Sequence, residues 1–104
     1  MRKFARVFVS VVAAGALVAV LPTSAQAARG SFAYRVDGYG HVLNDPEDYR
    51  CYNTPGTAGE PSNHTDRVAV LHRGAGCADG AVVNFLEPGM RTGDVFGSVR
   101  FISR

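Results

Sequence analysis

Residues 67–77 carry the strongest structural signal in the chain: Arg67-Val68-Ala69-Val70-Leu71-His72, then Arg73-Gly74-Ala75-Gly76, then Cys77. The first run is short, apolar and rich in β-branched residues, which predicts a buried strand, and the glycines after it predict a turn. After residue 27 no segment repeats apolar residues at the helical spacing of roughly three to four. We therefore expect an all-β fold.

Short runs of the same kind recur along the chain, each ended by glycine, proline or a polar cluster. We expect strands at residues 32–36, 41–43, 49–52, 67–72, 81–86 and 98–102, and a long polar loop at 53–63. Glycines and prolines are too frequent after residue 27 to leave room for helices of ordinary length. Short strands separated by turns are typical of a small antiparallel sandwich or barrel.

The first 27 residues have a different composition and predict a secretory signal peptide. Their start is positively charged, residues 7–21 are almost all apolar, and Ala25-Gln26-Ala27 has the small residues that signal peptidase prefers. The apolar run is shorter than the ~20 residues that span a bilayer. We expect cleavage between Ala27 and Ala28, a secreted extracellular protein, and a single domain over residues 28–104 with no membrane attachment once the signal peptide is removed.

Charge and composition limit the functions open to this domain. The whole chain of 104 residues has a formal net charge of +2. Residues 28–104 contain 8 Arg, no Lys and 9 Asp or Glu, which gives a net charge of −1. A protein that binds nucleic acid through a basic surface is therefore disfavoured. The excess of Arg over Lys, with abundant Ala, Gly and Val, indicates a GC-rich genome of the actinobacterial kind.

Cys51 and Cys77 are the only cysteines in the chain. A secreted chain meets an oxidising environment, and so small a domain buries little core to stabilise it. A disulfide that closes this loop of about 26 residues would stabilise the fold by about 3–4 kcal/mol. A metal pair or free thiols are the alternatives, but the spacing lacks the short Cys-x-x-Cys pattern of zinc sites. We therefore expect a Cys51–Cys77 disulfide.

The two halves of the domain share an order of features. In the first half a strand and a glycine-rich turn lead to Val42-Leu43-Asn44-Asp45-Pro46. In the second half a strand and a glycine-rich turn lead to Val83-Asn84-Phe85-Leu86-Glu87-Pro88-Gly89. Two units of this kind predict two Greek keys that face each other in one sandwich.

Five short motifs follow one another in the second half. They are Asn63-His64-Thr65-Asp66 (expected on an exposed turn), Val68-Ala69-Val70-Leu71-His72, Cys77-Ala78-Asp79-Gly80, Leu86-Glu87-Pro88-Gly89 and Phe96-Gly97-Ser98-Val99-Arg100-Phe101. Their order resembles a Greek-key half of the βγ-crystallin-like proteins, in particular the small secreted actinobacterial group that includes metalloproteinase inhibitors. The resemblance covers residues 31–102 and implies a Greek-key sandwich and an extracellular peptidase inhibitor.

Several positions depart from the pattern of that family. Its corner motif is an aromatic residue, four residues, a second aromatic residue, one residue and a glycine. Tyr34 and Tyr39 keep the interval between the aromatics, but Gly40 comes one position early. In the second half His72 and Cys77 stand in place of both aromatics.

The calcium motif of the family is also incomplete. Calcium-binding members carry two Asn or Asp residues, two other residues and then a Ser/Thr-Ser pair, and here Asp94 and Ser98 are the candidate ligands that remain. Calcium prefers six or more oxygen ligands, several of them anionic. We therefore expect no metal and no cofactor.

The polar residues contain no catalytic motif. The candidate acids and bases are three histidines and a carboxylate cluster: His41, His64, His72, Asp45, Glu47 and Asp48. Histidines titrate near neutral pH, and a buried carboxylate pair can do acid–base work, but carboxylates on a proline turn are usually solvated. A small secreted ribonuclease would need Glu87, His72 and Arg100 to meet at one site. We expect the protein not to be an enzyme.

The long polar loop is the best candidate for a binding surface. Its first residues are Asn53, Thr54, Pro55, Gly56 and Thr57. A disulfide at its base would tether it, and a tethered loop loses less entropy on docking; the alternative is a flexible surface connection. We expect a secreted, monomeric binding protein whose partner is a secreted protease or another extracellular protein. The alternatives are an antimicrobial or cell-surface-binding crystallin-like protein and a small secreted ribonuclease.

Overall fold

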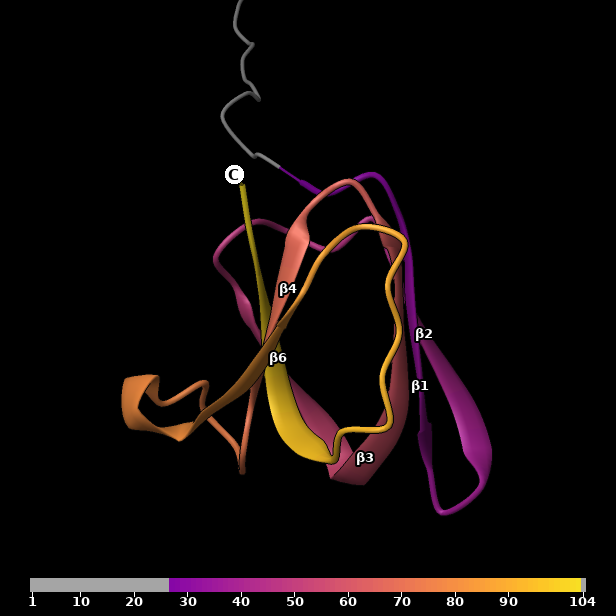
Figure 1. The fold of residues 1–104 in the computed structure, drawn as a ribbon, viewed down its shortest axis with the longest axis vertical. Coiled ribbons are helices and arrows are strands. Elements are labelled where there is room, and N and C mark those ends of the chain that lie inside the picture. Colours follow the sequence, from indigo (N-terminus) through magenta and orange to yellow (C-terminus); the bar gives the residue numbers. More distant parts are fainter. Residues whose placement is uncertain (1–26, 104) are drawn as a thin grey trace, which may run out of the picture.

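The computed structural model describes residues 27–103, which form an all-β domain (Figure 1). Its strands are β1 (Gly30–Val36), β2 (Tyr39–Asn44), β3 (Cys51–Thr65), β4 (Val68–His72), β5 (Val82–Leu86) and β6 (Phe96–Ile102). The helical structure within residues 27–103 is limited to one turn of 3-10 helix, η2 (Asp79–Ala81). The all-β prediction is therefore confirmed.

The predicted signal peptide lies outside the described residues, except for Ala27 at its end. Ala27 forms an isolated bridge with Glu47. Ala28 is buried, and its N–H donates to the carbonyl oxygen of Pro46 at 2.7 Å. The first residue of the expected domain is thus packed against the fold. Residues 27–103 include no helix with the length and apolar character of a membrane span.

The strands form one antiparallel sheet in the order β2-β1-β3-β6-β4-β5. β1 lies between β2 and β3, and β4 lies between β5 and β6. The two halves of the chain therefore have the same pairing pattern, and they join where β3 pairs with β6. This strand order agrees with the order of features that the two halves share in sequence.

β3 belongs to both halves of the sheet. Residues 51–53 pair with β6, the part from residue 58 to residue 65 pairs with β1, and Ala58 pairs with both strands. The register shifts between Asn53 and Ala58, and such an irregularity bends a strand. Figure 1 shows the result: β4 and β6 lie on one side, β1 and β2 lie on the other, and β3 connects them, so that the curled sheet is sandwich-like.

The prediction of a loop at residues 53–63 is wrong, because these residues are part of β3. Prolines normally end strands, since they cannot donate to the hydrogen-bond ladder. Here both prolines fall at shifts of register: Pro55 lies between Asn53 and Ala58, and Pro61 lies just before Ser62, where pairing with β1 resumes. At these positions the ladder needs no N–H, so the strand continues through both prolines.

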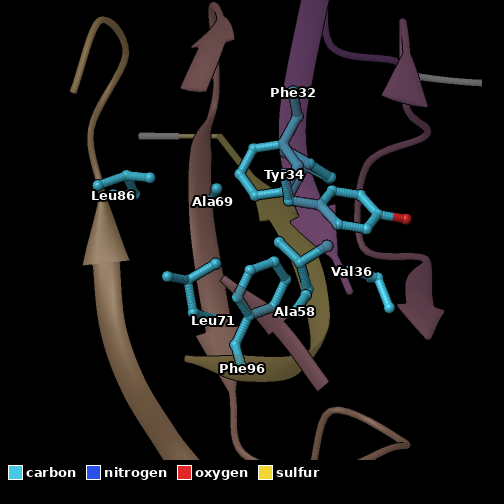
Figure 2. Close-up of a cluster of buried hydrophobic side chains, with 10 residues drawn as sticks. Phe32, Tyr34, Val36, Ala58, Ala69, Leu71, Leu86 and Phe96 are labelled. Carbon is cyan, nitrogen blue, oxygen red and sulfur yellow. The ribbon is translucent and has the colours of Figure 1, made fainter. Parts of the chain in front are cut away.

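Buried side chains from both halves meet in one core (Figure 2). The ring centroid of Phe32 lies 5.3 Å from that of Phe101 and 6.0 Å from that of Phe96, with edge-to-face geometry in both pairs. Figure 2 shows Phe32 and Leu71 pointing into the same space from β1 and β4. The other members of the core are Tyr34, Val36, Ala58, Ala69, Leu86 and Val99. Burial of each large side chain contributes on the order of 1.5–3 kcal/mol.

The side chain of Asn63 is buried and polar. The prediction that it lies on an exposed turn is therefore wrong. Its exposed fraction is 0%. Its Nδ2 donates to the carbonyl oxygens of Arg67 and Leu86, each at 2.8 Å. Its Oδ1 accepts from the N–H and the hydroxyl of Thr65 at 3.0 and 2.6 Å. The amide therefore joins the end of β3 to the start of β4 and the end of β5.

The predicted Cys51–Cys77 disulfide is confirmed. The sulfur atoms are 2.08 Å apart and the Cα atoms are 5.9 Å apart. Cys51 begins β3, and Cys77 lies in the turn that follows β4. The bond therefore attaches this turn to the strand that the two halves share.

Replacing both cysteines by serine (C51S/C77S) is expected to lower the free energy of unfolding by about 3–4 kcal/mol, because the unfolded chain regains the loop entropy that the bridge removes. Urea denaturation of the two proteins, followed by far-UV circular dichroism, measures the difference. Equal midpoints in urea would contradict a stabilising role for the bridge.

Asn63→Ala is expected to lower the free energy of unfolding by about 2–4 kcal/mol, because the carbonyls of Arg67 and Leu86 then lose their buried donor. Asn44, which is exposed at the end of β2, provides the control, and Asn44→Ala should change the stability by less than about 0.5 kcal/mol. The same urea titration measures both variants. Equal losses in the two would show that the buried amide network is not structural.

Candidate binding groove

A groove of about 570 Å³ lies between three segments of the chain. These segments are residues 54–57 of β3, residues 73–75 after β4 and residues 95–97 around the start of β6. The volume falls within the range of small-ligand sites, roughly 300–1,000 Å³. Four of the five candidate binding residues, 54–57, form one wall, and the fifth, Asn53, lies beside it.

The other two walls were not predicted from the sequence. They consist of Arg73, Gly74, Ala75, Val95, Phe96 and Gly97. Their meeting depends on sheet order, because β3 and β4 both lie next to β6. The only signal in the sequence was glycine at positions 74 and 97, since glycine allows two backbones to come close.

Ser98 holds the turn after β4 against β6. Its buried hydroxyl donates to the carbonyl oxygen of Gly74 at 2.8 Å and accepts from the N–H of Cys77 at 3.0 Å. On the β3 side, the hydroxyl of Thr54 donates to the carbonyl oxygen of Gly56 within its own wall and also lies 3.2 Å from the carbonyl oxygen of Gly97. The turn is thus hydrogen-bonded to β6, and the Thr54 hydroxyl brings the β3 wall into contact with β6.

Asn53 fixes the same turn from the β3 side. Its Oδ1 accepts from the N–H of Gly76 at 2.8 Å. The Cys51–Cys77 disulfide makes a second connection between this turn and β3. The three walls are therefore cross-linked to one another, so that a docking partner would have to order few further groups.

Gly97 and Gly74 approach each other backbone to backbone. A Cβ added to Gly97 would lie 2.7 Å from the Cα of Gly74. Gly74 has a φ of +75°, which favours glycine. The contact between the turn and β6 therefore depends on glycine at both positions.

Arg73 is the one charged residue that lines the groove. It is exposed, and its guanidinium forms no ion pair within residues 27–103. Val95, whose exposed fraction is 58%, adds apolar surface, whereas the side chain of Phe96 is buried in the core beneath the groove. The groove is therefore mainly apolar, with a single unpaired cation.

The two calcium candidates are engaged within the protein. Both hydrogen bonds of the Ser98 hydroxyl go to the turn after β4. The carboxylate of Asp94 accepts from Nδ2 of Asn84 at 2.8 Å, and hydrogen bonds from the side chains of Asn84 and Thr92 hold the pKa of Asp94 below its usual value. Residues 27–103 contain no group of three or more His, Cys, Asp or Glu side chains placed to hold a metal ion.

The three histidines lie in separate, structured settings. His41 stacks on Tyr34 with ring centroids 5.3 Å apart, and burial raises the pKa of the Tyr34 hydroxyl. Nε2 of His64 lies 2.8 Å from a neighbouring serine hydroxyl. His72, whose exposed fraction is 3%, donates from Nδ1 to the carbonyl oxygen of Ala78 at 2.9 Å. Its Nε2 has no hydrogen-bond partner in the described part of the chain.

The carboxylate cluster stabilises the N-terminal part of the fold. Asp45 accepts from the N–H of Gly30 at 2.8 Å. Asp48 forms an ion pair with Arg67 at 3.2 Å, and Glu47 forms one with the arginine three residues later at 3.6 Å. These carboxylates therefore have structural partners.

The residues of the ribonuclease alternative do not face one another. His72 pairs with Val82 at the start of β5, whereas Glu87 follows Leu86 at the other end of that strand. Arg100 lies on β6, opposite the middle of β4. The strand register thus separates the two residues that would have to act as the acid–base pair.

Comparison of the chain with models of protein families, with curated proteins and with solved structures finds no match. The resemblance to the βγ-crystallin-like proteins therefore rests on the short sequence motifs. The groove is defined by the geometry of this chain alone.

Gly97→Ala is expected to lower the free energy of unfolding by about 1–3 kcal/mol, because the new methyl group would overlap the backbone of Gly74. Gly59 in β3 is the matched control, since a Cβ there meets nothing within 4 Å. Gly59→Ala should leave the stability within about 1 kcal/mol of the parent. Thermal denaturation measures both. If the two variants proved equally stable, the close contact between the turn and β6 would not be a constraint on the fold.

Proposed function

We propose that this protein is a secreted, extracellular binding protein that docks another protein in the groove lined by residues 54–57, 73–75 and 95–97. The observation that carries the proposal is the cross-linking of the three walls by side-chain hydrogen bonds and by the Cys51–Cys77 disulfide. A surface that is already ordered loses little conformational entropy on binding. The signal-peptide pattern and the disulfide both suit an oxidising compartment.

We further propose that the sheet is a double Greek-key sandwich of the βγ-crystallin-like type. The support comes from counting β3 as two strands, 51–53 and 58–65. The first half then has four strands, and its fourth strand, 58–65, returns to lie beside its first, β1. In the second half the last strand, β6, lies beside the first, β4. A fourth strand that returns beside the first is the defining feature of a Greek key.

The third strand of each half also supports this assignment, because it pairs with the other half. Residues 51–53 pair with β6. In the second half Arg91 forms a bridge with Ser62 of β3. The N–H of Asn63 donates to the carbonyl oxygen of Met90 at 2.8 Å, which continues the same contact. Each half thus gives one short segment to the other, a strand from the first half and a bridged residue from the second.

The partner that we propose is a secreted peptidase. The resemblance to the group that includes metalloproteinase inhibitors supports this choice. An inhibitor must also resist cleavage by its target, and proteolysis requires backbone that can open locally. The disulfide and the hydrogen bonds of Ser98 and Asn53 restrain the backbone around the groove.

Titration of a thermolysin-type zinc peptidase and a subtilisin-type serine peptidase with the oxidised protein tests this function. We expect one of the two to lose its activity on a chromogenic peptide at a near-equimolar ratio. Ala75→Trp places a large side chain in the groove and blocks docking, so it should raise the protein concentration needed for inhibition at least about tenfold.

Ala78→Trp is the matched control, because Ala78 is exposed in the same connection but does not line the groove. This variant should inhibit as well as the parent protein. Unchanged activity of both peptidases would contradict the inhibitor assignment. If the protein instead arrested the growth of neighbouring microbes, the antimicrobial alternative would replace it.

A further inference from the structure

We propose that the groove binds the carboxyl terminus of a partner polypeptide, with the apolar last residues in the groove and the terminal carboxylate held by Arg73. This inference rests on the proposed function, because it names the part of the partner that enters the same groove.

Arg73 supplies the charge that selects a carboxylate. Its guanidinium has no ion-pair partner within residues 27–103, and no Asp or Glu lines the groove to compete for it. Guanidinium–carboxylate pairs are charge-assisted and often bidentate. In the same wall, the N–H groups of Gly74 and Ala75 have no acceptor in the described part of the chain, which adds two unused donors.

The apolar part of the lining sets the character of the last residues. Pro55, Ala75 and Val95 provide it. More than half of Val95 is exposed, which is costly for a side chain of its kind. An apolar side chain that covers Val95 would remove both surfaces from water. The groove therefore complements a ligand with an apolar body and a single negative charge.

The backbone of residues 54–57 favours a peptide over a free fatty acid. These residues have no register partner in β6 or in β1, because the ladder stops after Asn53 and resumes at Ala58. The carbonyl oxygen of Gly56 accepts from the Thr54 hydroxyl and Pro55 has no N–H, so the segment offers its other main-chain groups. An extended peptide can hydrogen-bond to an unpaired strand segment through its own main chain. A hydrocarbon chain would leave the same polar groups unused. A polypeptide terminus combines main-chain groups, apolar side chains and one carboxylate.

NMR titration of the isotopically labelled, oxidised protein tests the inference with three probes. The first is acetyl-Ala-Ala-Val with a free carboxylate, the second is the same peptide with a carboxyl-terminal amide, and the third is octanoate. We expect the free acid to shift the amide signals of Gly56, Gly74 and Gly97. We also expect it to bind about tenfold more tightly than the amide, because only the acid can pair with the guanidinium.

Arg73→Gln should reduce the affinity for the free acid to that for the amide, and it should leave the affinity for the amide unchanged. Arg91→Gln is the matched control, since Arg91 is an exposed arginine that does not line the groove. It should bind both peptides like the parent protein. An equal loss in the two variants would show that net charge, and not Arg73, governs binding.

The remaining outcomes separate this inference from the proposed function. Equal affinities for acid and amide would overturn the carboxylate assignment and leave the groove as a docking site. Binding of octanoate without binding of the peptide would overturn the polypeptide terminus in favour of a small carboxylic acid. The absence of shifts with all three probes would overturn both the inference and the proposal that the groove is a binding site. Peptidase inhibition is measured in a separate experiment. If the protein inhibits no peptidase, the NMR titration still shows which class of ligand the groove binds.

Discussion

Cys77 is held at two points, through its sulfur to Cys51 of β3 and through its backbone N–H to Ser98 of β6. These two bonds keep the turn after β4 on the sheet at the place where β3 and β6 meet. The groove depends on this attachment, because its walls come from that turn and from the two strands. A domain of this size has little core with which to hold such a turn by packing. A covalent bond and a buried hydroxyl do so instead.

The bend in β3 connects the fold to the groove. Because the pairing of β3 passes from β6 to β1, the sheet curls, and Phe32 of β1 reaches Phe101 of β6 in one core. The shift of register between Asn53 and Ala58 leaves residues 54–57 outside the ladder, where they form a wall of the groove. A regular strand at this position would leave the sheet flatter. It would also use the backbone of residues 54–57 for pairing with β6, although we propose that this backbone binds the ligand. Both the curl of the sheet and the wall of the groove therefore depend on this irregularity.

The sequence predicted the parts of the fold that depend on local pattern. The strands at 67–72 and 98–102 and the disulfide follow from short apolar runs and a cysteine pair. β3 was misread because its prolines signal a loop, and only the pairing register shows that they fall where no N–H is needed. Asn63 was misread as exposed because its acceptors come from distant segments. One wall of the groove was predicted for its polar composition, but the other two follow from sheet order, which local pattern does not contain.

The connection between the two strands of the first hairpin differs between the two halves, and this difference accounts for the position of the groove. Tyr34 and Leu71 both point into the core from the middle strand of their half, so Leu71, and not His72, corresponds to Tyr34. In the first half Tyr34 stacks on His41 beside a two-residue turn. The second half has no aromatic at that position, and its longer connection, residues 73–81, is fixed by the disulfide and by Ser98. The longer connection supplies the wall that carries Arg73. The longer connection thus takes the place of the aromatic stacking in the first half and also supplies one wall of the groove.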